Sequence, residues 1–208
     1  MKNGLEGMPV CAGPAHPSGS ARQSRLSRSR DCSNSSLPGD NAGVFYLDLF
    51  DALARHDVRY VVVGGLALNL HGVERATMDV DLVVALDPPN LGAAIDAFET
   101  LGLVPVAPVK IDEARNPETL ARWRRDKNMI AFGLRPKQGV GPTVDCLVEP
   151  AVPFAQLVRN AITKSIGAIR IPVASIDDLI ALKRAAGRAV DLADIDALER
   201  LKRLGLDG

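Results

Sequence analysis

The segment from Arg59 to Leu86 contains two apolar strand-type runs that are joined by a diglycine and a short helix-type stretch. The first run, residues 59–63, is rich in β-branched residues and suits a buried strand. Gly64-Gly65 breaks this run, and the second run, Asp79–Leu86, follows the helical stretch. A strand that passes through two glycines directly into a helix predicts a fold with alternating strands and helices.

Helical and strand patterns continue to alternate from Val44 to the end of the sequence. Helices are predicted at residues 45–57, 66–71, 90–101, 119–127, 154–160, 175–186 and 191–204. Strands are predicted at residues 59–63, 79–86, 129–134, 143–148 and 169–173. We therefore expect one α/β or α+β domain over residues 44–208, closed by a pair of C-terminal helices.

Residues 1–43 have a different composition, rich in Gly, Pro, Ser and Arg, and show no hydrophobic period. Such a segment cannot bury enough apolar surface to offset the entropy of ordering it. We expect a disordered extension. Its arginines leave open a contact with nucleic acid or a resemblance to an organellar presequence: Arg22, Arg25, Arg28 and Arg30.

Composition excludes several classes of protein. The 25 Lys and Arg residues balance 25 Asp and Glu residues, which argues against coating nucleic acid by bulk charge. Aromatic residues make up 4% of the chain, which disfavours a base-stacking platform, and no apolar run approaches the ~20 residues of a membrane span. Three cysteines without metal-ligand spacing favour a reducing, cytoplasmic compartment.

Asp79 and Asp81 lie two residues apart in an apolar strand, so they point to the same face, about 6–7 Å apart along the backbone. Two carboxylates so placed repel each other and lose hydration, and a cation relieves both costs. Oxygen ligands without His or Cys favour Mg²⁺ or Mn²⁺. Asp145, in the apolar run TVDCLV, offers a third carboxylate. The alternative is that one aspartate caps a turn while the other is solvated.

The diglycine itself permits two interpretations. Backbone amides without side chains at the start of a helix can hold phosphate oxygens. A dinucleotide fingerprint is excluded because the third glycine of G-x-G-x-x-G is missing, and no Lys-Ser/Thr follows as in a P-loop. Taken alone, Gly64 and Gly65 are equally consistent with a simple turn.

Together these motifs resemble the polymerase-β-type nucleotidyltransferase superfamily, and most closely its minimal bacterial branch related to abortive-infection toxins. Residues 60–84 (YVVVGGLALNLHGVERATMDVDLVV) carry the branch's G-G-x-A and R-x-T-x-D-x-D patterns. Residues 171–198 (IPVASIDDLIALKRAAGRAVDLADIDAL) are similar to its Lys…Arg…Asp…Asp tail. The resemblance implies a mixed β-sheet flanked by helices, with the glycine turn and the Asp-x-Asp motif around a nucleotide cleft.

The resemblance also implies roles for individual residues. Gly64 and Gly65 would hold triphosphate oxygens, and the Thr77 hydroxyl would contact a phosphate. Asp79 and Asp81 would bind the metal ions. Asp145 would be either a third ligand or the base that takes the acceptor's proton.

In the C-terminal motif, the resemblance makes Lys183 a catalytic, phosphate-directed cation, although a lysine beside apolar residues often extends to solvent. Arg188 and Asp191 would complete the nucleotide site, with Asp191 orienting Lys183 or Arg188. The alternative for Asp191 is an N-cap of the last helix. Asp194 is expected to face solvent or to pair with Arg188.

The function implied is transfer of a nucleoside monophosphate from an NTP, such as ATP, to a macromolecular hydroxyl, with release of pyrophosphate. RNA, above all a tRNA end, is the first acceptor and a protein side chain the second. The resemblance also suggests a toxin–antitoxin or phage-defence setting with a cognate partner. The competing interpretation is a catalytically inert module of the same fold that binds a nucleotide or a partner.

The segment around Trp123 is rich in basic residues and allows a local RNA-binding patch or a solvated helix face: Arg122, Arg124, Arg125 and Lys127. His56 and His71 have no His or Cys partners nearby in sequence and are expected to be structural.

Overall fold

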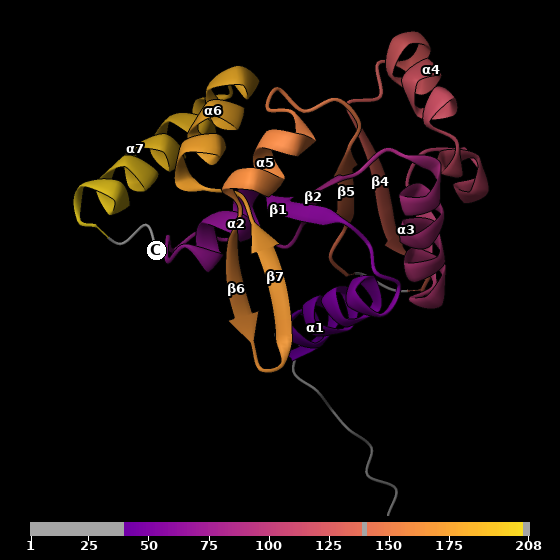
Figure 1. Cartoon of the computed structure of the whole chain (residues 1–208), viewed down its shortest axis with the longest axis horizontal. Helices are drawn as coiled ribbons and strands as arrows, with labels where there is room; N and C mark the ends of the chain where they lie inside the picture. The colour runs from indigo at the N-terminus through magenta and orange to yellow at the C-terminus, as the bar shows by residue number, and fades with distance from the viewer. Residues whose placement is uncertain (1–39, 139–140, 206–208) are drawn as a thin grey trace, which may run out of the picture. The chain divides into compact units, whose positions relative to one another are not determined.

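The computed structural model describes residues 40–138 and 141–205 and contains a seven-stranded mixed sheet with the order β3-β4-β5-β2-β1-β7-β6 (Figure 1). The strands are β1 (Tyr60–Val63), β2 (Val80–Val84), β3 (Leu103–Pro105), β4 (Ala131–Pro136), β5 (Val144–Leu147), β6 (Ile162–Ile166) and β7 (Ile169–Val173). The helices are α1 (Asp40–Arg55), α2 (Gly64–Leu70), α3 (Pro88–Thr100), the 3-10 helix η1 (Ile111–Arg115), α4 (Pro117–Lys127), α5 (Phe154–Asn160), α6 (Ile176–Ala186) and α7 (Ala189–Arg203). The expected mixed sheet flanked by helices is confirmed.

Strand β2 lies at the centre of the sheet, between β1 and β5. It pairs with β1 in antiparallel orientation, with Val63 opposite Asp81, and with β5 in parallel orientation, with Asp81 beside Asp145. Strand β4 continues the sheet in antiparallel orientation, with Gly133 opposite Asp145. The registers thus bring residues from distant parts of the sequence into one row across the sheet.

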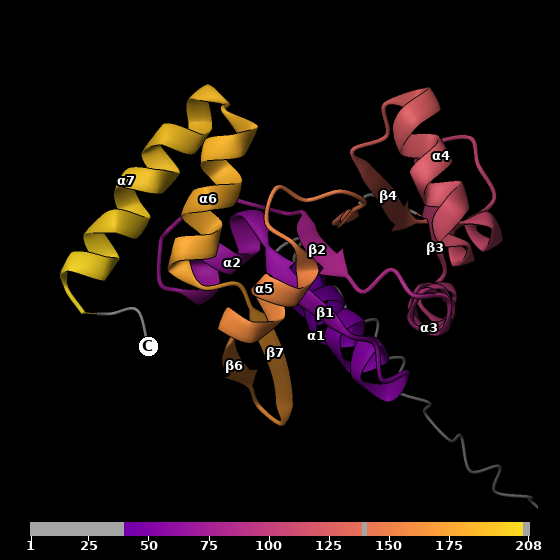
Figure 2. The ribbon, with the colours of Figure 1, turned by 45° about the horizontal axis from the view of Figure 1, so that its top comes forward.

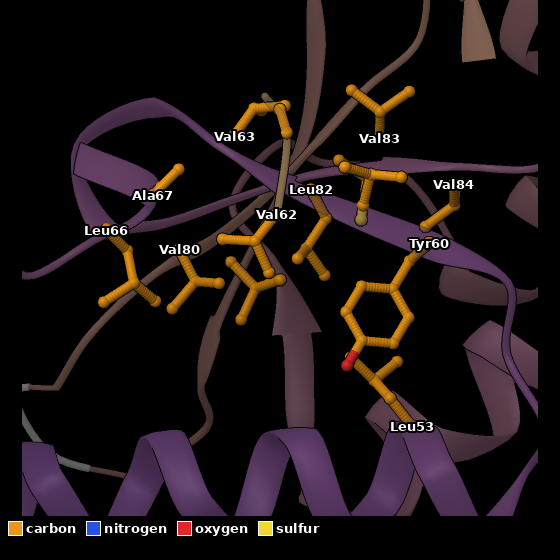
Figure 3. Close-up of a cluster of buried hydrophobic side chains, with 14 of the residues drawn as sticks. Leu53, Tyr60, Val62, Val63, Leu66, Ala67, Val80, Leu82, Val83 and Val84 are labelled. Atoms are coloured by element: carbon orange, nitrogen blue, oxygen red, sulfur yellow. The ribbon is translucent and has the colours of Figure 1, made fainter. Parts of the chain in front are cut away.

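The two faces of the sheet differ because strand side chains alternate between them. Figure 3 shows Tyr60, Val62 and Leu82 pointing toward α1, with Leu53 beside Tyr60, while Val83 lies on the other side. Leu53, Val62 and Leu82 have no exposed surface. Burying each such side chain stabilises the fold by about 1.5–3 kcal/mol, which fixes the strand register and leaves Asp81 on the opposite face.

The C-terminal helices α6 and α7 pack against each other (Figure 2). Helix α6 begins after Ser175, whose side chain accepts a hydrogen bond from the Asp178 N–H, and it ends at Gly187 in a left-handed conformation. These caps satisfy backbone groups at both helix ends. The predicted C-terminal helical pair is therefore present.

Two strands and one 3-10 helix were not predicted: β3, β6 and η1. Strand β3 has three residues, and β6 lies at the sheet edge with mostly exposed or half-buried side chains, so neither has a strong apolar pattern. Helix α1 begins at Asp40, before the predicted domain boundary at Val44. Residues 1–39 of the predicted tail, which was expected to cover residues 1–43, lie outside the described residues. In the described part of the chain, no helix has the length and apolar character needed to cross a membrane.

Candidate active site

Helix α2 begins at Gly64, directly after β1, and this glycine has a positive φ of 65°. A Cβ atom at position 64 would lie 1.8 Å from Oδ2 of Asp81, so glycine is needed for the close approach of that carboxylate. The Gly65 N–H donates a hydrogen bond to the Asp81 carboxylate. The diglycine turn therefore holds the Asp81 side chain against the end of β1.

The loop that precedes β2 packs against Gly65, the second glycine of the turn. A Cβ atom at Gly65 would lie 2.8 Å from Oγ1 of Thr77 and 3.2 Å from Nη1 of Arg75. The Thr77 hydroxyl also lies 3.5 Å from the backbone oxygen of Asp79. The structure thus places Thr77 beside the diglycine turn, where a phosphate contact is expected from the sequence.

The three predicted carboxylates lie on one face of the sheet. Asp81 and Asp145 are paired in the β2–β5 register, and Asp79 lies two residues before Asp81. The Thr143 hydroxyl donates a hydrogen bond of 2.8 Å to Oδ1 of Asp79. Parallel pairing of β2 with β5 is what brings Asp145 to residues more than 60 positions earlier in the sequence.

The charges of these carboxylates are only partly compensated. Burial, followed by the negative charges of Asp145 and Asp79, raises the pKa of Asp81 to about 6, although the Gly65 N–H and Arg188 act in the opposite direction. Burial and the charge of Asp79 also raise the pKa of Asp145. Desolvated, mutually repelling oxygen donors of this kind are suited to a hard divalent cation such as Mg²⁺.

No group of three His, Cys, Asp or Glu side chains in residues 40–138 and 141–205 is arranged to hold a metal ion by itself. Mg²⁺ commonly takes one or two carboxylates from the protein and completes its shell with water and substrate phosphates. The donor chemistry of Asp79, Asp81 and Asp145 fits that mode of binding.

The C-terminal motif forms a network of charged residues that joins α6, α7 and the loop before β2. Lys183 is 4% exposed, and its Nζ lies 2.6 Å from Oδ2 of Asp194 and 3.3 Å from Oδ1 of Asp191. Arg75 Nη1 contacts the same Asp194 oxygen at 3.0 Å, and Arg188 Nε contacts Asp191 at 2.9 Å. The network therefore connects the C-terminal helices to the segment that carries Thr77.

Two expectations for this motif are corrected. Asp194 does not face solvent and does not pair with Arg188; it is 6% exposed and pairs with Lys183 and Arg75, because α7 packs this side toward α6. Asp191 is not the N-cap, because α7 begins earlier, at Ala189. Its carboxylate instead accepts hydrogen bonds from the backbone N–H and the guanidinium of Arg188, and the latter lowers the pKa of Asp191 to about 2.

Lys183 and Arg188 differ in access. The Lys183 ammonium reaches a phosphate only if its contacts with the two buried aspartates break. The Arg188 side chain is 66% exposed. Its positive charge acts to lower the pKa of Asp81, so the guanidinium lies close to the carboxylate face. Arg188 is thus the accessible cation of the motif.

Several residues of the site were not predicted from the sequence. Thr143 binds Asp79, and Gly133 lies opposite Asp145, where a Cβ atom would be 2.9 Å from Oδ1 of that carboxylate. Only the β4–β5 and β2–β5 pairings bring these residues to the site. The TVD pattern at Thr143–Asp145 was a usable signal for Thr143, since residues two apart in a strand share a face.

The basic residues of α4 lie elsewhere. Trp123 stacks on Phe132 with ring centroids 5.8 Å apart, and Phe132 precedes Gly133 in β4, so α4 covers the face opposite Asp145. Arg124 pairs with Glu149. The basic residues of α4 therefore lie on the face of the sheet opposite the carboxylates, and the local RNA-binding patch expected there stays a prediction, as does its alternative, a solvated helix face.

His71 is buried, and its Nε2 lies 2.8 Å from the backbone oxygen of Ala174. This contact ties the end of α2 to the residue that follows β7, which agrees with the expected structural role.

Known proteins resemble this chain in sequence and in fold. The profile of the family described as "Nucleotidyl transferase AbiEii toxin, Type IV TA system" matches residues 48–207. No curated protein matches the sequence of this chain.

Two solved structures with a TM-score of 0.50 share the fold of this chain at low sequence identity. A crystal structure of ANT(2")-Ia in complex with adenylyl-2"-tobramycin has a TM-score of 0.50 and 13% sequence identity. The match covers 79% of this chain and 90% of the ANT(2")-Ia chain. The solution structure of ANT(2'')-Ia has a TM-score of 0.50 and 12% identity, with coverage of 81% and 86%. An antigenic nucleotidyltransferase-like protein from Paracoccidioides brasiliensis has a TM-score of 0.49 and 18% identity, with coverage of 78% and 77%.

Proposed function

Because the chain belongs to the AbiEii family of nucleotidyl transferase toxins and is a nucleotidyltransferase, we propose that it moves a nucleoside monophosphate from an NTP to a macromolecular hydroxyl. RNA, in particular a tRNA end, is the first acceptor that we propose, and a protein side chain is the second. The observation that carries the proposal is the row of carboxylates beside the diglycine turn: Asp79, Asp81 and Asp145.

The chemistry assigned to the site is an in-line displacement. The acceptor oxygen attacks the α-phosphorus, the bond to the bridging oxygen of pyrophosphate breaks, and pyrophosphate leaves. We assign to Asp145 the role of taking the acceptor's proton, and its raised pKa is consistent with that role. Asp145 is suited to this because it lies on the side of Asp81 away from β1.

Asp79 and Asp81 are the residues proposed to hold Mg²⁺ or Mn²⁺. When bound, the cation neutralises charge on the triphosphate during the displacement. Gly64, Gly65 and Thr77 are proposed to lie along the triphosphate, because they form the surface next to Asp81.

For the C-terminal motif, we assign the phosphate contact to Arg188, because its guanidinium is exposed near Asp81. Asp191 holds that guanidinium through two hydrogen bonds of 2.9 and 3.1 Å. Lys183, which contacts Asp191 and Asp194, is proposed to act as a positioning residue in this conformation. The nucleotide site predicted from the sequence thus keeps Lys183, Arg188 and Asp191, with Arg188 closest to the substrate.

The family description includes a type IV toxin–antitoxin system. We therefore propose a cognate antitoxin as the partner of this chain, and the cytoplasm, which supplies NTPs, as its compartment. The ANT(2")-Ia crystal structure is a complex with adenylyl-2"-tobramycin, an adenylylated molecule, which supports nucleotidyl transfer on this fold without identifying the acceptor here.

The test is transfer of label from each α-labelled NTP to total RNA or total protein with Mg²⁺. Transfer should disappear in Asp79→Ala and persist in Asp48→Ala, which removes an exposed carboxylate from α1. Intact nucleotide binding without transfer to any acceptor would overturn the proposal in favour of an inert nucleotide-binding module.

A further inference from the structure

We propose that the open part of the carboxylate face, formed by Val106, Gly133 and Arg135, seats the acceptor, and that the acceptor is a nucleic acid whose backbone phosphate binds Arg135. This inference rests on the proposed function, whose first acceptor is RNA, and it names the residues that receive that acceptor.

The register of the outer strands places these three residues beside Asp145. Gly133 lies opposite Asp145 in the β4–β5 pair, and the Val106 N–H donates a hydrogen bond of 2.9 Å to the Gly133 carbonyl. Arg135 lies two residues beyond Gly133 in β4, opposite Val104 of β3. Residues two apart in a strand share a face, so Arg135 lies on the carboxylate face, about 7 Å along the strand from Gly133.

This part of the face is open. Gly133 has no side chain, and a Cβ atom there would contact Asp145 Oδ1 at 2.9 Å and Val106 Cγ2 at 3.5 Å. Val106 is 57% exposed although it adjoins Gly133, so it offers an apolar surface next to the proposed proton acceptor. A ribose or a base can lie on such a surface while its hydroxyl faces Asp145.

Charge selects the class of acceptor. A phosphodiester that approaches this face meets three carboxylates, and a nearby cation has to offset their repulsion. The Arg135 side chain is exposed and makes no hydrogen bond or ion pair with residues of the described ranges, 40–138 and 141–205. A guanidinium without an acidic partner can bind phosphate oxygens in a bidentate manner. A protein hydroxyl needs no such cation, so a nucleic acid is favoured.

The basic helix α4 does not supply this charge, because it covers the opposite face of the sheet through the Trp123–Phe132 stack. The exposed Arg122 on α4 therefore provides a matched control. Replacing either arginine with glutamine removes one positive charge from an exposed position.

The experiment measures the affinity of the full chain for total tRNA and for a labelled single-stranded RNA at several salt concentrations. We expect Arg135→Gln to weaken RNA binding about tenfold and to lower the salt slope by about 1, as removal of one phosphate contact does. Arg135→Lys should recover part of the affinity, and Arg122→Gln should leave it unchanged. NTP affinity and the thermal midpoint should not change in any of these variants.

Transfer assays separate this inference from the proposed function. A KM for RNA that rises about tenfold in Arg135→Gln, at unchanged KM for NTP, would support it. Unchanged RNA affinity in Arg135→Gln, weakening in Arg122→Gln instead, or a labelled product that is protein would overturn it while the proposed function stands. If the wild-type chain transfers nothing, the proposed function fails, and the RNA affinities alone still decide whether Arg135 binds phosphate.

Discussion

At the scale of a single residue, Asp81 combines burial with a negative charge, and burial disfavours that charge. It lies within the central strand, against Gly64, where water is largely excluded, and the carboxylates of Asp145 and Asp79 lie nearby. An ionised group in this place lowers the stability of the fold. The same negative charge would bind the proposed divalent cation, so we expect Asp81 to lower stability in exchange for metal binding.

The first prediction concerns Asp81→Asn, which removes the charge but keeps an oxygen to accept the Gly65 N–H. The pKa of Asp81 is about 6 in the fold against an ordinary value of 3.8, so stability is lost as pH rises from about 4 through 6. Without metal at pH 7.5, the variant should be more stable by on the order of 2 kcal/mol. Urea unfolding at pH 7.5 and pH 4 checks this, because the gain should vanish at pH 4.

Added Mg²⁺ and NTP provide the control for this prediction. They should stabilise the wild-type chain and not Asp81→Asn, because the carboxylate is the proposed ligand. A variant that is less stable than the wild type at pH 7.5 in EDTA would contradict the assignment of an uncompensated charge.

The second prediction separates two reasons for a glycine at position 64. Gly64 and Gly102 both have φ of 65°, but a Cβ atom at Gly102 meets nothing within 4 Å, whereas at Gly64 it would overlap the Asp81 carboxylate. Gly102→Ala should cost only about 1 kcal/mol of backbone strain. Gly64→Ala should in addition displace Asp81 and lower transfer about 100-fold, since an error of about 1 Å in position has effects of this size.

Unfolding curves and transfer rates of the two alanine variants check this prediction. Equal transfer rates in both variants would mean that Asp81 has no role in catalysis or that the turn relaxes without moving it.

At the scale of elements, the charged network fixes the C-terminal helices relative to the loop before β2. Lys183 on α6 contacts Asp191 and Asp194 on α7, and Arg75 in the loop contacts Asp194. Buried ion pairs add little net stability, but removing one partner leaves an uncompensated charge. We therefore expect the network to favour one arrangement of these elements around the proposed nucleotide site.

The third prediction concerns Lys183→Met, which keeps the length of the side chain and removes its charge. It leaves two buried carboxylates with one cation fewer, so we expect a loss of about 3–5 kcal/mol in the free energy of unfolding. Arg184→Met is the matched control on the same helix: Arg184 is 65% exposed and pairs with Glu199, so the expected loss is below about 1 kcal/mol. Urea denaturation measures both, and equal losses would show that the buried network is not important for stability.

At the scale of the whole molecule, the two faces of the sheet differ: one contributes to the hydrophobic core, and the other carries the residues of the candidate site. One face is buried under α1, as Val62 and Leu82 show, and the other carries the carboxylates. Because neighbouring residues alternate between the faces, a strand such as VDLVV supplies core residues and Asp81 at once. Figure 1 shows α1 on one side of β1 and β2 and α5 on the other.

Much of the central fold was predictable from local patterns. The apolar runs of β1, β2 and β5 and the helix signals around Ser175 and Gly187 were found because they are strong and short in range. Strands β3 and β6 were missed because they bury few side chains, and their pairing partners, not their sequences, keep them extended.

The same division holds for the candidate site. Local spacing was enough to predict the Asp-x-Asp pair, the diglycine and the family, since each depends on residues close together in the chain. The position of Asp145 beside Asp81, the burial of Lys183 between two aspartates and the place of Arg135 on the carboxylate face could be seen only in the folded chain. The reason is physical: these relations depend on strand register and helix packing, which arise from contacts between residues far apart in the chain.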